Sequence, residues 1–124
     1  MPEGLADRQH ALRTIGLALA ACEKVVQNVY EHNLRPEAKQ HEPWLERIDG
    51  QRAAAFELLE QEIARMPVPA DARALDQAGL TAAVVWTFTQ AMLPGKVDPA
   101  RHPALAAFTS AVERFAPFQD LPHA

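Results

Sequence analysis

Apolar residues recur at helical spacing along most of the chain, and no segment alternates apolar and polar residues with the period of two that a strand would show. In the first thirty residues they follow one another in alternating steps of three and four. This stripe comprises Leu12, Ile15, Leu19, Cys22, Val26 and Val29. The spacing predicts a long helix from Leu5 to about His32 whose stripe packs in the core. Pro36 disfavours helical backbone at Arg35, so the helix should end there.

A second helix is predicted to begin near Pro43, because proline is favoured in the first turn of a helix. Its apolar positions repeat at helical spacing, and two further residues widen the apolar side. They are Trp44, Ile48, Ala55, Leu59 and Ile63, with Phe56 and Leu58 beside them. Three nearby acidic residues, Glu57, Glu60 and Glu62, are interpreted as a solvent-exposed side in preference to an acid–base group.

The segment from Ala74 to Met92 is apolar on nearly every side and has no charged residue after Asp76. Such a helix is expected to be buried among others, and Pro94-Gly95 should end it. A last helix is predicted to begin near Arg101-His102-Pro103 and to end at Pro117, with Phe118 and Leu121 folding back onto the bundle. Its apolar positions are Leu105, Phe108, Val112 and Phe115. The sequence thus predicts an all-α bundle of four main helices with a buried central helix.

Size and composition narrow the class of protein. The 124 residues fit one domain, with 48% hydrophobic and 23% charged residues and a net charge of −4. No run of Lys or Arg offers the cationic surface that nucleic acids require. The longest apolar stretch is interrupted by Thr and Gln and falls short of the ~20 residues of a membrane span. With a single cysteine, Cys22, we expect a cytoplasmic protein that binds neither nucleic acid nor membrane.

Groups that could carry chemistry are sparse. The five histidines include no pair at a spacing of three or four residues, so no metal site is predicted. Ser110 is the only serine, and no glycine-flanked nucleophile turn surrounds it. Cys22 is interpreted as a small buried hydrophobic residue, with a reactive thiol as the alternative. The chain therefore offers no convincing catalytic set.

Four segments, in order, carry a resemblance to a known family. They are Val29-Tyr30-Glu31-His32-Asn33-Leu34-Arg35-Pro36-Glu37; Trp44-Leu45-Glu46-Arg47; Leu75 to Phe88; and Arg101-His102-Pro103-Ala104-Leu105-Ala106-Ala107-Phe108 with Ala116-Pro117-Phe118-Gln119. Together they resemble the C-terminal all-helical domain of the glutathione S-transferase family, in its bacterial branches. The resemblance covers essentially residues 1–124. Each segment alone is a weak signal, whereas the ordered set is fairly specific.

The resemblance implies that most of the glutathione site and the activating Ser, Tyr or Cys belong to an N-terminal thioredoxin-like domain, which we expect this chain to lack. The chain would then be part of a longer protein or a stand-alone domain, and both remain open. By the same resemblance, Val26, Val29, Tyr30 and Asn33 would line the site of a small hydrophobic electrophile. For Val26 and Val29, a plain core role is the alternative.

The resemblance also implies a homodimer in which Glu23 reaches towards glutathione across the subunit interface, with an ordinary solvated glutamate as the alternative. Glutathione would be a co-substrate of the intact protein only, and no metal is implied. Where many members carry a Ser/Thr-x-x-Asp capping box, this chain has Ala74 and Gln77. Asp71 or Asp76 would then cap the buried helix and shift its start.

The expected function is therefore that of the helical half of a glutathione transferase, inactive as an isolated chain. It would supply the wall of the electrophile site and part of a dimer interface. The alternative is a non-catalytic docking module on the same fold, and a helical ligand-binding bundle unrelated to the family is a third possibility.

Overall fold

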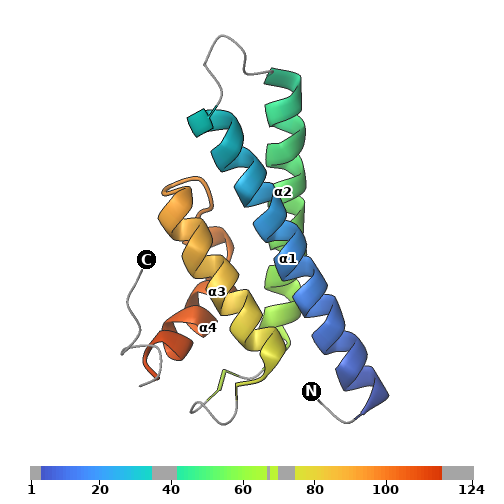
Figure 1. The fold of residues 1–124 in the computed structure, drawn as a ribbon. Helices are drawn as coiled ribbons and strands as arrows, with labels where there is room; N and C mark the ends of the chain where they lie inside the picture. The colour runs from blue at the N-terminus through green and yellow to red at the C-terminus, as the bar shows by residue number, and fades with distance from the viewer. Residues whose placement is uncertain (1–3, 35–41, 67, 70–74, 116–124) are drawn as a thin grey trace.

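The computed structural model describes residues 4–34, 42–66, 68–69 and 75–115. Within these ranges every regular element is a helix, which confirms the predicted all-α bundle (Figure 1). The α-helices are α1 (Leu5–Leu34), α2 (Glu42–Ala64), α3 (Gln77–Met92) and α4 (Pro103–Glu113), and a 3₁₀ turn, η3 (Pro99–Arg101), precedes α4. None of the described helices combines the length and apolar content that a membrane crossing requires.

The two long helices, α1 and α2, lie side by side and run in opposite directions (Figure 1). Helix α3 packs along α1, and the shorter α4 packs against both α3 and α2. Their facing sides enclose one hydrophobic core. The largest fully buried apolar side chains of the described residues are Phe56, Phe108, Ile48, Leu59, Ile63, Leu105, Val25 and Val112.

The buried side of α1 is not the predicted stripe. The residues that face α2 and α3 are Ala11, Thr14, Ala18, Ala21, Val25 and Asn28. Leu12, Leu19 and Val26, which the stripe placed in the core, are instead 58%, 57% and 45% exposed. The helix is turned by about one residue, roughly 100°, from the predicted setting. Small side chains on the buried side suit close packing, because the distance between two helices depends on the side chains at their contact.

Helix α2 begins at Glu42, one residue before the predicted Pro43. Four apolar residues buried along it, Ile48, Phe56, Leu59 and Ile63, are those that the sequence predicted. At the start of the helix Leu45 is buried, whereas Trp44 is 40% exposed. Leu58 is also exposed, so the apolar side of α2 is narrower than predicted.

Two of the three glutamates expected to face solvent do not. Glu57 is exposed as predicted, but Glu60 is half-buried and Glu62 is buried. The Glu60 carboxylate accepts hydrogen bonds from the backbone N–H groups of Ala104 (2.9 Å) and Leu105 (2.8 Å). These N–H groups lie in the first turn of α4, where they have no partner within the helix. His102, the residue before α4, makes no side-chain capping bond, so α2 supplies the cap.

Helix α3 begins at Gln77, later than the predicted Ala74, because Asp76 is its cap. The Asp76 carboxylate accepts a hydrogen bond from the Gly79 N–H at 2.8 Å. Of the two alternatives, Asp76 is thus the observed cap, while Asp71 lies outside the described residues. The helix ends at Met92 ahead of Gly95, whose φ of 80° is a left-handed conformation that glycine tolerates.

Side chains on most sides of α3 are buried, but one side remains exposed. Ala78, Ala82, Val85 and Trp86 are among its buried residues, whereas Val84 is exposed. The last helix begins at Pro103 as predicted, and its apolar positions Leu105, Phe108 and Val112 are buried. The helix ends at Glu113, four residues before the predicted Pro117. Pro117 itself, and the predicted folding back of Phe118 and Leu121, lie outside the described residues.

Gly79 of α3 lies against the Phe108 ring of α4 and gives a test of this packing. A Cβ at position 79 would lie 2.6 Å from Cζ of Phe108, whereas a Cβ at Gly50 in α2 would meet nothing within 4 Å. We expect Gly79→Ala to lower the free energy of unfolding by about 1–3 kcal/mol through overpacking. The control Gly50→Ala should raise it by roughly 0.5–1 kcal/mol. Urea denaturation measures both, and a stabilised Gly79→Ala variant would contradict the packing.

Candidate functional site

A line of exposed apolar side chains runs along α1. We call it the outer face of α1 and define it as Leu5, Leu12, Leu19, Val26 and Tyr30, of which Leu5 and Tyr30 are 73% and 59% exposed. The first four lie seven residues apart, so they form one row along the helix, about 30 Å long. Single exposed apolar residues are ordinary, whereas several on the same side of one helix are a candidate surface for a partner or a ligand.

The predicted ligand-wall residues occupy different places on α1. Val26 and Tyr30 both lie on the outer face, four residues apart and therefore on neighbouring turns of the same side. Val29 is half-buried and packs against the core cluster. The side chain of Asn33 lies outside the described residues. The structure thus brings Val26 and Tyr30 together on an accessible surface, and sets Val29 at the edge of the core.

The residue predicted to reach glutathione, Glu23, is exposed on α1. Its carboxylate oxygen Oε1 accepts a long hydrogen bond, 3.5 Å, from Nε2 of Gln27 one turn further along the same helix. This contact leaves the carboxylate accessible. Its role in binding glutathione remains a prediction.

Cys22 is half-buried and packs against the core cluster from α1. Burial raises the pKa of its thiol above the ordinary value. A smaller fraction is then thiolate at neutral pH, and thiolate is the nucleophilic form. The environment of Cys22 therefore favours the structural interpretation over the reactive one.

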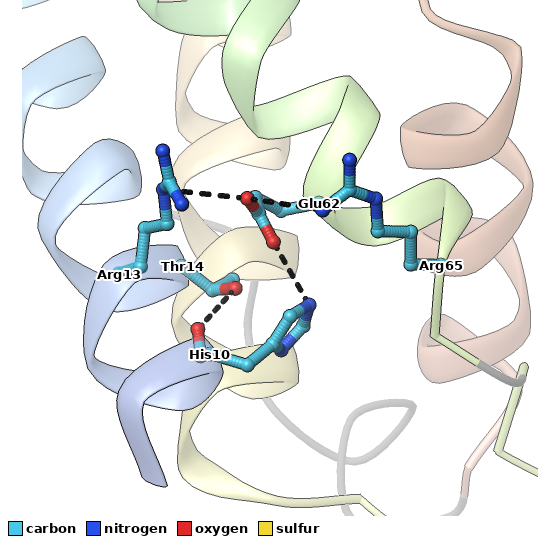
Figure 2. A network of polar contacts seen from close by, with 5 residues as sticks. All are labelled: His10, Arg13, Thr14, Glu62 and Arg65. Carbon is cyan, nitrogen blue, oxygen red and sulfur yellow. Dashed lines mark hydrogen bonds and ion pairs between the residues drawn. The ribbon is translucent and has the colours of Figure 1, made fainter. Parts of the chain in front are cut away.

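A buried carboxylate joins the two long helices (Figure 2). The side chain of Glu62 in α2 is only 7% exposed and is approached by His10 and Arg13 of α1 and by Arg65, just after the end of α2. Its Oε1 lies 3.4 Å from Nε of Arg13 in α1 and 3.9 Å from Nη1 of Arg65. Its Oε2 lies 2.9 Å from Nε2 of His10, although the angle is not that of a hydrogen bond.

The contacts of Glu62 connect α1 to α2. Both oxygens of Glu62 face side chains of the same chain, and the Thr14 hydroxyl donates to the His10 carbonyl oxygen at 2.9 Å (Figure 2). Buried carboxylates are tolerated when they are paired in this way. Sequence reasoning missed the cluster because Glu62 lies about fifty residues from its partners in α1.

A second polar cluster joins the same helices further along α1. The buried Asn28 donates from Nδ2 to Oδ1 of Asp49 at 2.8 Å. Arg52 donates from Nη1 to Oδ1 of Asn28 at 2.6 Å and to Oδ1 of Asp49 at 3.0 Å. Asn28 continues the spacing of the buried small residues of α1, and this is the one sequence signal that could have placed it inside.

The described residues include no group of three or more His, Cys, Asp or Glu side chains that could hold a metal ion. Ser110 is exposed on α4, far along the chain from the half-buried Cys22 on α1. Compared with models of known protein families and with curated proteins, the chain matches none of them.

The Glu62 cluster yields a test of the α1–α2 contact. We expect Glu62→Gln to lower the free energy of unfolding by about 1–3 kcal/mol, because charge-assisted contacts are lost at a buried site. The matched control is Glu57→Gln, an exposed glutamate on the same helix, which should change it by less than about 0.5 kcal/mol. Thermal or urea unfolding of the two variants makes the comparison, and equal midpoints would count against the cluster.

Proposed function

We propose that this chain is the helical half of a glutathione transferase-like protein and that the outer face of α1 is its binding surface. The single observation that carries the proposal is the exposed apolar row from Leu5 to Tyr30. A thioredoxin-like domain would pack against part of this row. The resemblance of four ordered sequence segments to the family, together with the all-α bundle, supports the same view.

Within this proposal, Val26 and Tyr30 form an apolar wall that holds a small hydrophobic electrophile. Both residues are exposed, and the phenol ring of Tyr30 joins an apolar body to a polar hydroxyl. Glutathione would come from the thioredoxin-like domain with its thiol activated there, and Glu23 would approach its amino group. The helical half then contributes proximity and orientation, because it holds the acceptor beside the sulfur.

A non-catalytic docking role on the same surface is the second candidate. The observation that favours it is the seven-residue spacing of Leu5, Leu12, Leu19 and Val26, all of them exposed on α1. A seven-residue apolar repeat is the period with which one helix packs along another. A second copy of this chain is the simplest partner, which gives a cytoplasmic homodimer.

The transferase proposal predicts that this chain alone does not catalyse glutathione conjugation. The expected rate with a chloronitrobenzene substrate is that of the uncatalysed reaction, because the thiol-activating residue belongs to the other domain. Absorbance of the conjugate measures the rate over a range of substrate concentrations. Saturable turnover by the purified chain would show that the reactive groups lie within it. It would overturn the proposal that thiol activation belongs to a separate thioredoxin-like domain.

The outer-face proposal predicts that the isolated chain self-associates and binds a neutral apolar dye such as Nile red. The double variant Leu12→Gln/Leu19→Gln should be monomeric by light scattering and should lose most of the dye fluorescence, because it interrupts the row at its centre. The matched control is Leu58→Gln/Val84→Gln, two exposed apolar residues on α2 and α3. A monomeric, dye-negative parent chain, or equal losses in both variants, would contradict the proposal.

A further inference from the structure

A pocket lies between α2 and the segment that connects α3 to α4. Its volume is about 300 Å³, at the small end of the range for small-molecule sites. The side chains that matter for its chemistry are Arg52 and Phe56 of α2, and Lys96, Asp98, Arg101 and His102 of the connecting segment. None of them belongs to the outer face of α1, so this pocket is a separate feature of the molecule.

The pocket is lined by positive charge in a chain whose net charge is −4. Three cationic side chains, Arg52, Lys96 and Arg101, stand against one acidic side chain, Asp98. The Arg52 guanidinium is paired with Asp49, whereas Lys96 and Arg101 are exposed and form no ion pair with any residue that the structure describes. The Asp98 carboxylate is engaged in its own turn, where Oδ1 accepts from the Ala100 N–H at 2.9 Å.

Arg52 gives the pocket a fixed positive charge. The residue is only 9% exposed, and Nη1 is held by Asn28 and Asp49. Its Nε has almost no accessible surface and no hydrogen-bond partner among the described residues, so this atom does not face the open space of the pocket. A guanidinium held in this way attracts the oxygens of a phosphate or carboxylate through its charge.

The opposite wall of the pocket is held in place by the connecting segment. Gln90 of α3 donates from Nε2 to the Val97 carbonyl oxygen at 2.8 Å, and the Val97 side chain is buried. The His102 ring is also buried, with Nδ1 3.0 Å from the Asp98 carbonyl oxygen. The same ring lies edge-on to Phe56, with centroids 5.9 Å apart. A wall fixed in this way needs little ordering when a ligand binds.

We propose that this pocket binds the phosphate or carboxylate group of a small-molecule anion. Arg52 would supply fixed positive charge from the α2 side, while Lys96 and Arg101 would neutralise the charge of the anion at the mouth of the pocket. The volume admits a ligand larger than a bare phosphate ion, and Phe56 and Val97 supply apolar surface for the remainder. The site is independent of the proposed transferase role, because it uses none of the residues on the outer face.

The test compares two double variants of the full chain. Lys96→Gln/Arg101→Gln removes both exposed cations of the pocket and leaves Arg52, which also fastens α2 to α1, in place. Arg47→Gln/Arg114→Gln is the matched control, since it removes the same charge from exposed positions that do not line the pocket. Unfolding midpoints close to that of the parent chain verify that both variants are folded.

Titration calorimetry at low ionic strength would use three probes: phenyl phosphate, inorganic phosphate and benzoate. We expect saturable binding of at least one probe, weakened about tenfold in the pocket variant and nearly unchanged in the control variant. The probe with the lowest Kd identifies the preferred anionic group. Tighter binding of phenyl phosphate than of inorganic phosphate would show that the apolar surface of the pocket contributes to affinity. Absence of saturable binding by all three probes, or equal weakening in both variants, would overturn the proposal.

Discussion

The close packing of α1 against both α2 and α3 is the contact on which the rest of the molecule depends. It uses small residues, Ala11, Ala18 and Ala21, on the side of α1 that meets the two neighbours. Since consecutive residues of a helix point about 100° apart, the larger residues one position further along must turn away from that contact. Leu12 and Leu19 are therefore exposed as a consequence of the same packing that buries Ala11 and Ala18. The core and the outer face are two results of one constraint.

The sequence predicted the type, order and most of the limits of the helices, because these depend on local signals. Leu34 ends α1 close to Pro36, Pro103 opens α4, and Gly95 follows the end of α3. Such signals act on the backbone of neighbouring residues and need no knowledge of the fold. The rotation of α1 about its own axis had no local signal. The predicted stripe and the buried row both advance in steps of three and four, and hydrophobicity alone favours the stripe, which has the larger side chains.

The polar contacts were beyond sequence reasoning for a different reason, namely the distance between partners along the chain. A glutamate in a helix is ordinarily exposed, and Glu57 follows that rule. Glu60 does not, because it meets the first N–H groups of α4 more than forty residues away. Glu62 meets side chains of α1 about fifty residues before it. Only the assembled fold shows that the Glu60 carboxylate caps α4 and that the Glu62 carboxylate connects α1 to α2. The predicted ligand residues divide in the same way: Val26 and Tyr30 are accessible because α1 turns them outwards, and Val29 is not.

The two surfaces proposed for binding differ in chemistry, yet the side chain of Arg52 connects the elements that carry them. The outer face of α1 is apolar, while the pocket beside α2 is cationic. Arg52 lines the pocket and also holds Asn28, which lies in α1 between Val26 and Tyr30. An anion held in the pocket binds the folded chain only, so by mass action it would stabilise the arrangement in which Arg52 holds Asn28 of α1.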